Sequence, residues 1–296
     1  VYGYYRHAYP DQMVGKVGRY YQSMGGIPQR PLHRARYRLF REFLEASGCR
    51  VAGARAAPPP RLSAARAGTT TYGKNCFAFA DRSGSFITIS TFLVDVELDC
   101  DAPTLKVACP EKCTLCIDAC PTGALYQSLK MDPRRCIARN SYATEQPVTP
   151  MELRRGMGNW VFGCDVCQDV CPRNRARLKL KLPPSAYLEM LAGDFELEGL
   201  LAMTDQSFRR VQPLLNYITE KRLFQRNAAV ALGNRGDPAS VPALERAMDD
   251  PEEIVRGHAA WALGEIGGAP ARQALEKRLS TEPTGYVRDE IGAALG

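Results

Sequence analysis

Cysteine spacing carries the clearest chemistry in this chain. Eight of its eleven cysteines form two runs with one further cysteine between them: Cys109-x3-Cys113-x2-Cys116-x3-Cys120-Pro121, then Cys136, then Cys164-x2-Cys167-x3-Cys171-Pro172. Two residues between cysteines allow one loop to wrap around an inorganic cube, and the cysteine before proline commonly binds the other cube of a pair. The spacing therefore predicts two iron–sulfur clusters of the [4Fe–4S] type.

The crossed ligand also predicts how the cysteines divide between the clusters. Cluster 1 is expected to take Cys109, Cys113, Cys116 and Cys171. Cluster 2 is expected to take Cys120, Cys136, Cys164 and Cys167. The three-residue gap after Cys109 is one residue longer than the usual spacing. The remaining cysteines, Cys49, Cys76 and Cys100, are expected to be free thiols.

Zinc and disulfides are the alternative uses of such cysteines. A zinc site closes with four ligands and has no use for a following x3-Cys-Pro, which occurs here twice. Disulfides are typical of exported proteins, and no charged segment followed by an apolar stretch and a cleavage site opens this sequence. No run approaches the roughly 20 apolar residues of a membrane span. We therefore expect a soluble cytoplasmic protein that does not bind membranes.

Positive charge is concentrated in two parts of the chain. The formal net charge is +7, yet residues 1–80 contain thirteen Lys or Arg and only three acidic residues, Asp11, Glu42 and Glu45. A second basic run follows the last cluster cysteine and consists of Arg173, Arg175, Arg177, Lys179 and Lys181. Such runs attract polyanions, although a solvated basic surface is the alternative. RNA and an anionic cofactor are the candidate partners.

The elements that position the cysteines are predicted from periodicity. A helix is expected over 32–47, ended by Gly48, and strands over 76–80 and 85–94, joined by a turn at 82–84. The loop 68–75 is rich in Gly, Thr and Asn, which suits a turn or close approach to a ligand. A short helix is expected over 150–157, between the cysteine runs.

The last quarter of the chain is repetitive. The segment Leu223–Gly233 returns as Ile254–Gly264 and, truncated, as Val287–Gly296, and residues 241–248 and 271–279 supply partner helices. Helix pairs with a period near 30 predict an α-solenoid of the HEAT type, which favours docking or capping over catalysis. His258 corresponds to Asn227 of the preceding repeat, so we expect it to make a polar contact rather than bind metal. The predicted segments are 1–101, 102–174, 175–220 (a helical linker) and 221–296.

Several of these strings together carry a family resemblance. They are Tyr72-Gly-Lys-Asn-Cys76, Gly84-Ser85, Asp118-Ala-Cys-Pro-Thr-Gly-Ala-Leu125, Arg135-Cys136-Ile137, Gly158-Asn159 and Gly163-Cys-Asp-Val-Cys-Gln-Asp-Val-Cys-Pro172. With the closing repeats they resemble the epoxyqueuosine reductases, the cobalamin-dependent enzymes of tRNA queuosine synthesis. The resemblance runs from about Arg19 to the end of the chain.

The resemblance implies an α+β multidomain architecture. It comprises a nitroreductase- or reductive-dehalogenase-like α/β corrinoid domain, partial here, then a ferredoxin-like module with two clusters, then the HEAT-like repeats. It also implies that electrons pass from a donor such as flavodoxin or ferredoxin through the clusters to cobalamin, whose reduced cobalt removes the epoxide oxygen from epoxyqueuosine. The implied partner is the anticodon arm of tRNA, and a monomer is expected. The implied corrinoid-binding residues are Lys74, Asn75, Ala78, Ala80, Ser85, Ile89, Asp165 and Val166.

The chain departs from the family pattern at three places. Ala54 stands where the family has the aspartate of a Val-Asp-Thr-Gly motif, the presumed proton donor, so the catalytic residue is unknown, with Tyr72 or water as substitutes. The chain begins without the family's first strand and helices, which predicts a corrinoid pocket that is incomplete. Pro110 occupies the family's first ligand position, one place after Cys109, and a small insertion follows Cys136. The alternatives are a corrinoid reductase with another substrate and a non-catalytic electron carrier with a HEAT docking tail.

Overall fold

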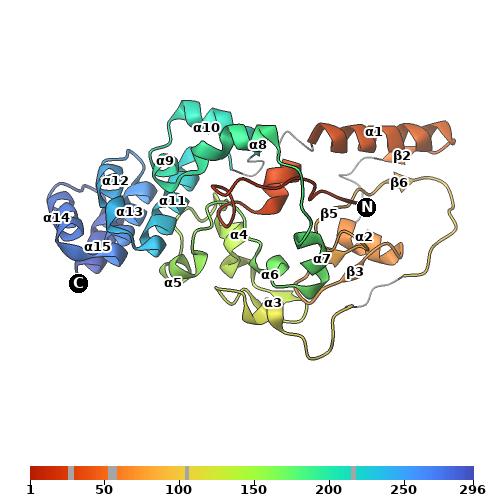
Figure 1. The fold of residues 1–296 in the computed structure, drawn as a ribbon, viewed down its shortest axis with the longest axis horizontal. Helices are drawn as coiled ribbons and strands as arrows, with labels where there is room; N and C mark the ends of the chain where they lie inside the picture. The colour runs from red at the N-terminus through yellow and green to blue at the C-terminus, as the bar shows by residue number, and fades with distance from the viewer. Residues whose placement is uncertain (26–29, 53–58, 104–106, 215–217) are drawn as a thin grey trace. The chain divides into compact units, whose positions relative to one another are not determined.

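A computed structural model describes residues 1–25, 30–52, 59–103, 107–214 and 218–296 (Figure 1). These residues form two compact units. The first contains residues 1–8, 19–132 and 165–185, and the second contains residues 9–18, 133–164 and 186–296. The division of the sequence into four segments stays a prediction. Within the described ranges, no helix is long and apolar enough to cross a membrane.

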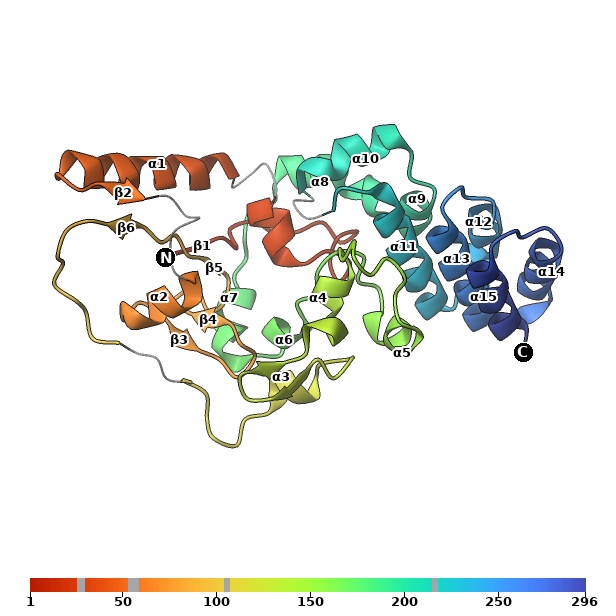
Figure 2. The same ribbon diagram turned by 180° about the vertical axis from the view of Figure 1, so that it is seen from behind.

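Helix α1 of the first unit confirms the predicted helix over 32–47. It spans Arg30–Ala46, and Gly48 follows it with a φ of 87°, a left-handed conformation that is typical of glycine at a helix end. In Figure 2 the short strand β2 (Val51–Ala52) runs along α1, and it pairs antiparallel with β6 (Leu93–Val94). Phe40 and Phe43 of α1 are exposed.

The other strands of the first unit are shorter than predicted. β1 (Tyr2–Gly3) pairs with β5 (Ile87–Thr88), and β3 (Thr71–Tyr72) pairs with β4 (Ala78–Phe79), all antiparallel. The expected single strand over 85–94 was wrong in extent, because β5 and β6 pair with different partners. The expected turn at 82–84 is present: Arg82 and Gly84 have φ angles of 63° and 58°, and the Ala80 and Gly84 backbones exchange two hydrogen bonds of 3.0 Å. The helix α2 (Pro60–Arg66) precedes β3.

Two short helices of the first unit each carry a cysteine from one of the two runs. α3 (Leu115–Asp118) carries Cys116, and α6 (Val166–Asp169) carries Cys167. The two helices are in contact and lie side by side in both views (Figures 1 and 2). β7 (Leu125–Gln127), β8 (Lys130–Met131) and α7 (Arg175–Leu178) complete this part. A small aromatic core of Tyr4 and Phe86 packs beneath Tyr5 and Tyr20.

The regular elements of the second unit are helices in the part of the chain that the structure describes. It contains α4 (Ile137–Asn140), α5 (Met151–Arg154), α8 (Ala186–Leu191), α9 (Leu197–Leu201) and α10 (Asp205–Val211). A 3₁₀ turn over Arg155–Met157 extends α5, which confirms the helix predicted over 150–157. The repeats form α11 (Lys221–Arg235), α12 (Val241–Ala247), α13 (Glu253–Ile266), α14 (Gly268–Leu279) and α15 (Gly285–Leu295). The predicted repeat is therefore confirmed helix by helix.

Glycines at equivalent positions allow the long repeat helices to pack closely. A β-carbon on Gly233 would lie 2.8 Å from the Ala262 backbone, and one on Gly264 would lie 2.7 Å from the Ala294 side chain. Both glycines are inside their helices rather than beyond the ends, so close contact with the next repeat explains them better than helix termination does.

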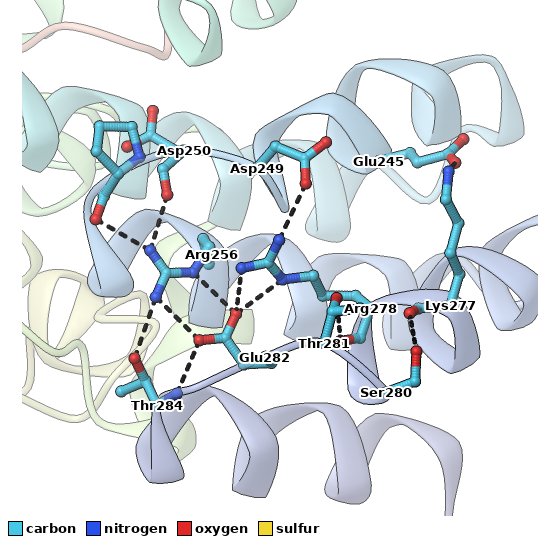
Figure 3. Close-up of polar contacts among 11 residues, drawn as sticks. Glu245, Asp249, Asp250, Arg256, Lys277, Arg278, Ser280, Thr281, Glu282 and Thr284 are labelled. Carbon is cyan, nitrogen blue, oxygen red and sulfur yellow. Dashed lines mark hydrogen bonds and ion pairs between the residues drawn. The ribbon is translucent and has the colours of Figure 1, made fainter.

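A charged network closes the turn between α14 and α15 (Figure 3). The fully buried Glu282 carboxylate accepts hydrogen bonds from Arg256 Nε (2.9 Å) and Arg278 Nε (2.8 Å) and from the Thr284 backbone N–H (3.0 Å). Burial raises the pKa of Glu282, but these donors outweigh it and lower the pKa to about 2. The turn is therefore held by a carboxylate that stays ionised at neutral pH.

Candidate iron–sulfur site

The four cysteines predicted for cluster 1 all belong to the first unit. Burial raises the pKa of the Cys116 thiol to about 11, with further contributions from Cys171, Cys109 and Cys113. Burial and the proximity of Cys109 also raise the pKa of Cys171. Cys109, Cys113 and Cys171 are therefore among the groups that act electrostatically on Cys116. A bound cation would reverse the effect, because coordinated thiols lose their protons.

The arrangement differs from that of a single-ion site. No group of three or more His, Cys, Asp or Glu side chains could hold one metal ion in the part of the chain that the structure describes. A [4Fe–4S] cube binds one thiolate at each of four irons, so its ligands lie farther apart than those of one zinc ion.

The cysteines predicted for cluster 2 are divided between the two units. Cys120 and Cys167 belong to the first unit, next to α3 and within α6, whereas Cys136 and Cys164 belong to the second unit. Cys136 immediately precedes α4 in an extended conformation. This ligand set stays a prediction.

Lys74 and Asn75, which are predicted to contact a corrinoid, both contact the cysteine runs. The Lys74 ammonium donates to the carbonyl oxygens of Pro110 (3.1 Å), Glu111 (2.6 Å) and Cys113 (2.9 Å). The buried Asn75 amide donates to the carbonyl oxygen of Cys167 (3.2 Å). Two consecutive residues of the β3–β4 loop therefore hold both runs.

Ser85 belongs to a buried network behind the second cysteine run. Its hydroxyl donates to Gln168 Oε1 (2.8 Å), and its backbone N–H donates to Asn174 Oδ1 (2.9 Å). Asn174 Nδ2 in turn donates to the Ser85 hydroxyl (2.9 Å) and to the Gln168 carbonyl (2.8 Å). Gly84 makes this possible, because a β-carbon there would lie 2.1 Å from Asn174 Oδ1.

Asp165 is likewise engaged by the protein. It is 3% exposed and accepts from the Arg19 backbone N–H (2.7 Å) and guanidinium (3.1 Å). Burial raises its pKa to about 6, although Arg19 acts in the opposite direction. Arg19 also pairs with Asp169 (2.5 Å). Val166 begins α6 beside this cluster of charges.

Ile89, another predicted corrinoid residue, lines a groove of the first unit. Two adjoining grooves of about 250 and 290 Å³ share Val1, Ser90 and Phe92 as lining residues. Ile89 and the small residues Ala64 and Ala67 line the larger one. Ala78 is buried and Ala80 half-buried in and after β4. Ala54 lies outside the described residues.

Sequence reasoning missed three residues that hold the site. Arg173 donates to the Tyr72 carbonyl (3.2 Å) and the Thr71 hydroxyl (2.6 Å) and lies 4.0 Å from the centre of the Phe79 ring. It was assigned only to a basic run. Arg19 and Asn174 carried no signal in a single sequence, because each binds a partner that is far away along the chain.

Family comparisons agree with this architecture. Residues 109–174 match the family described as the 4Fe-4S double cluster binding domain, and residues 211–296 match HEAT repeats. The fold and the cysteine arrangement thus define an iron–sulfur protein with a double-cluster domain and a HEAT-repeat end.

Comparison with individual proteins narrows the class. The chain is 33% identical to the epoxyqueuosine reductase of Bacillus anthracis over 243 residues, which are 79% of this chain and 61% of the relative. It is 34% identical to that of Bacillus subtilis over 234 residues, 78% and 59% respectively. The chain thus spans about three fifths of the length of these relatives.

Solved structures show the same likeness. A crystal structure of epoxyqueuosine reductase with an epoxyqueuosine-modified tRNA stem loop superimposes with a TM-score of 0.74 at 29% identity, covering 90% of this chain and 71% of that one. This chain is therefore similar to the epoxyqueuosine reductases over most of its length.

Proposed function

We propose that this chain forms the electron-carrying part and part of the cofactor pocket of an enzyme that reduces epoxyqueuosine in tRNA to queuosine. The observation that carries the proposal is the match of residues 109–174 to the double-cluster domain, within which Cys109, Cys113 and Cys171 act electrostatically on Cys116. Cluster 1 would be bound by Cys109, Cys113, Cys116 and Cys171. Cluster 2 would be bound by Cys120, Cys136, Cys164 and Cys167.

The reaction needs the electrons that two clusters supply. Opening an epoxide to an alkene breaks two C–O bonds, consumes two electrons and two protons, and releases water. Each [4Fe–4S] cluster passes one electron at a time, so a pair holds the electrons for one turnover. An external donor such as a flavodoxin or a ferredoxin would refill them.

Cobalamin is the proposed second cofactor. When bound, it would supply a low-valent, nucleophilic cobalt that neither cluster offers. The grooves beside Ile89 fit part of such a group, since small and apolar side chains line them and their volumes together lie near the lower end for ligand pockets. Four other predicted residues would have a structural role, because they would hold the backbone beneath the cofactor-binding surface: Lys74, Asn75, Ser85 and Asp165.

The anticodon arm of tRNA is the proposed substrate-bearing partner. The solved relative with a modified tRNA stem loop supports it, as does the positive charge of residues 1–80. Arg175, Lys179 and Lys181 are exposed, so they are available to phosphates next to the last cluster cysteine. A monomer in the cytoplasm is the expected working form.

Anaerobic reconstitution tests the proposal. The chain is loaded with iron, sulfide and cobalamin, passed through a desalting column and incubated with reductant and tRNA that contains epoxyqueuosine. We expect about eight irons per chain, retained corrin absorbance, and queuosine in place of epoxyqueuosine in the nucleoside digest. Clusters without retained corrin and without substrate loss would contradict the reductase and favour an electron carrier with a HEAT docking end.

A further inference from the structure

We propose that Lys74 is a positioning residue for cluster 1, which fixes the loop that carries Cys109 and Cys113 and raises the reduction potential of the cluster. The inference rests on the ligand set proposed above. It differs from the corrinoid contact expected for this lysine from the family resemblance.

The geometry at Lys74 satisfies all of its donors. An ammonium group has three N–H bonds, and three carbonyl oxygens between Pro110 and Cys113 accept from Nζ at 3.1, 2.6 and 2.9 Å. Pro110, Glu111 and Lys112 form the loop between the first two ligands of cluster 1, and Cys113 is the second of these ligands. Three hydrogen bonds from one point fix the path of that loop, which otherwise has no helix or strand to hold it.

The loop that carries Lys74 is itself fixed to both runs. Asn75 Nδ2 donates to the carbonyl of Cys167, and its Oδ1 accepts from the Phe77 N–H (3.3 Å). The Tyr72 carbonyl accepts from the Ala108 N–H (2.9 Å), immediately before Cys109. Lys74 therefore acts from a rigid support rather than from a free loop end.

The charge of Lys74 has a separate effect. Its three acceptors are neutral carbonyl groups, so the ammonium keeps its full positive charge next to the ligand loop. Reduction adds one negative charge to a cluster, and a nearby cation in a partly buried site stabilises the reduced form. Net charge and hydrogen bonding around the sulfurs are among the factors that set cluster potentials.

Lys112 provides a matched control. It lies in the same loop, next to Cys113, and its side chain is exposed. Replacing either lysine by an uncharged residue changes the net charge equally, but water screens the charge of Lys112 more strongly. A difference between the two variants would therefore result from the position of Lys74 and not only from the loss of one positive charge.

The experiment compares Lys74→Gln, Lys74→Met and Lys112→Met as reconstituted chains, with iron content and a redox titration followed by EPR. We expect Lys74→Gln, which keeps donors but no charge, to retain both clusters. At the wild-type midpoint of one cluster its reduced-to-oxidised ratio should fall about tenfold, equivalent to about 59 mV for one electron. Lys74→Met should show the same shift and lose iron from that cluster, and Lys112→Met should change neither reading.

Equal shifts in Lys74→Gln and Lys112→Met, or unchanged iron and potentials in Lys74→Met, would overturn the inference. If Lys74→Gln already loses one cluster, the positioning role stands only if Lys112→Met keeps both. Failure of the proposed function is distinguishable, because the unaltered chain would then lack the pair of clusters, or would hold both clusters without retaining corrin or converting epoxyqueuosine. Two clusters whose iron content and reduction potentials do not change in the Lys74 variants would contradict this inference and leave the proposed function standing.

Discussion

Arg154 and Glu290 form a buried ion pair with two parallel hydrogen bonds. Arg154 Nη1 and Nη2 donate to the two carboxylate oxygens at 2.7 and 2.6 Å, and the side chains are 1% and 8% exposed. Arg154 Nε donates to the Thr149 carbonyl (3.0 Å), and the guanidinium lies 5.7 Å from the Trp261 ring centre. The last repeat helix is thereby joined to α5, in the segment between Cys136 and Cys164.

Glu290 is one of three residues, at equivalent positions in the repeats, that bond to the segment between Cys136 and Cys164. Asn227, His258 and Glu290 occupy the same position in successive repeats, and each is buried. Asn227 Nδ2 donates to the Ser141 and Val161 carbonyls (2.8 Å each), and His258 Nε2 accepts from the Thr149 N–H (3.1 Å). The prediction that His258 makes a polar contact is confirmed.

Removing the Glu290 charge should destabilise the second unit strongly. In Glu290→Gln the buried Arg154 charge loses its counter-ion, and we expect a loss of roughly 3 to 5 kcal/mol in the free energy of unfolding. Urea unfolding followed by circular dichroism measures it. Glu276→Gln is the control, because its pair with Arg272 is exposed and should matter by less than about 1 kcal/mol. Similar losses in both variants would show that the buried ion pair contributes no more to the free energy of unfolding than the exposed one.

His258 should make the second unit less stable below neutral pH. Burial lowers the pKa of His258 well below 6.5, and the charges of Arg154 and Arg226 lower it further. The unfolded chain therefore binds a proton that the folded chain does not, so stability is complete above about pH 6.5 and falls as the pH drops below it. We expect the urea midpoint of wild type to fall between pH 7.5 and 5.5. The fall should be smaller in His258→Asn, and an identical fall would exclude His258 as its source.

Glu282 should act in a lower pH range. Its folded pKa of about 2 lies below the usual value of 4.5, so its contribution is complete above about pH 4.5 and is lost as the pH falls toward 2. The difference corresponds to a contribution on the order of 3 kcal/mol. Hydrogen exchange of α15 amides at pH 5 and pH 3 would measure it, with Glu282→Gln as the variant that should lose the dependence. Persistence of the dependence in that variant would assign it to other carboxylates.

Gly84→Ala should loosen the second cysteine run. The new β-carbon would overlap Asn174 Oδ1, and the alanine would have to keep the left-handed φ of 58°. We therefore expect at least about 2 kcal/mol of destabilisation and weaker iron retention. Gly193→Ala is the matched control, since its β-carbon meets nothing within 4 Å. Thermal unfolding and iron content of reconstituted chains provide the comparison. Equal behaviour of both variants would mean that the backbone at Gly84 shifts without cost.

Cysteine variants should separate the ligands from the free thiols. Cys116→Ala and Cys136→Ala should each remove about half of the bound iron, because each proposed cluster loses one of its four ligands. Cys100→Ala, at an exposed cysteine outside the pattern, should retain all of it. Iron and sulfide analysis after anaerobic reconstitution measures the loss. Full iron content in Cys136→Ala would remove it from the ligand set of cluster 2.

The parts of the structure that sequence reasoning predicted best are those with local causes. The repeat helices depend on alanine and glycine positions that recur within the same few turns. The strands were overestimated, because β5 and β6 end where their different partners end, and a β-branched run does not reveal this. Lys74 was recognised within a family string, but its acceptors lie 36 to 39 residues later in the chain and only folding brings them near. Glu290 was read as part of a truncated repeat, since Arg154 lies 136 residues before it.

The series Asn227, His258 and Glu290 limits how the repeat region can evolve. The three positions present an amide donor, a ring acceptor and a carboxylate to three different groups between residues 141 and 161. A duplicated or deleted repeat would move every later helix by one place and present the wrong chemistry to each group. Solenoids commonly vary in repeat number. In this chain the order of these three helices is therefore part of the folding information.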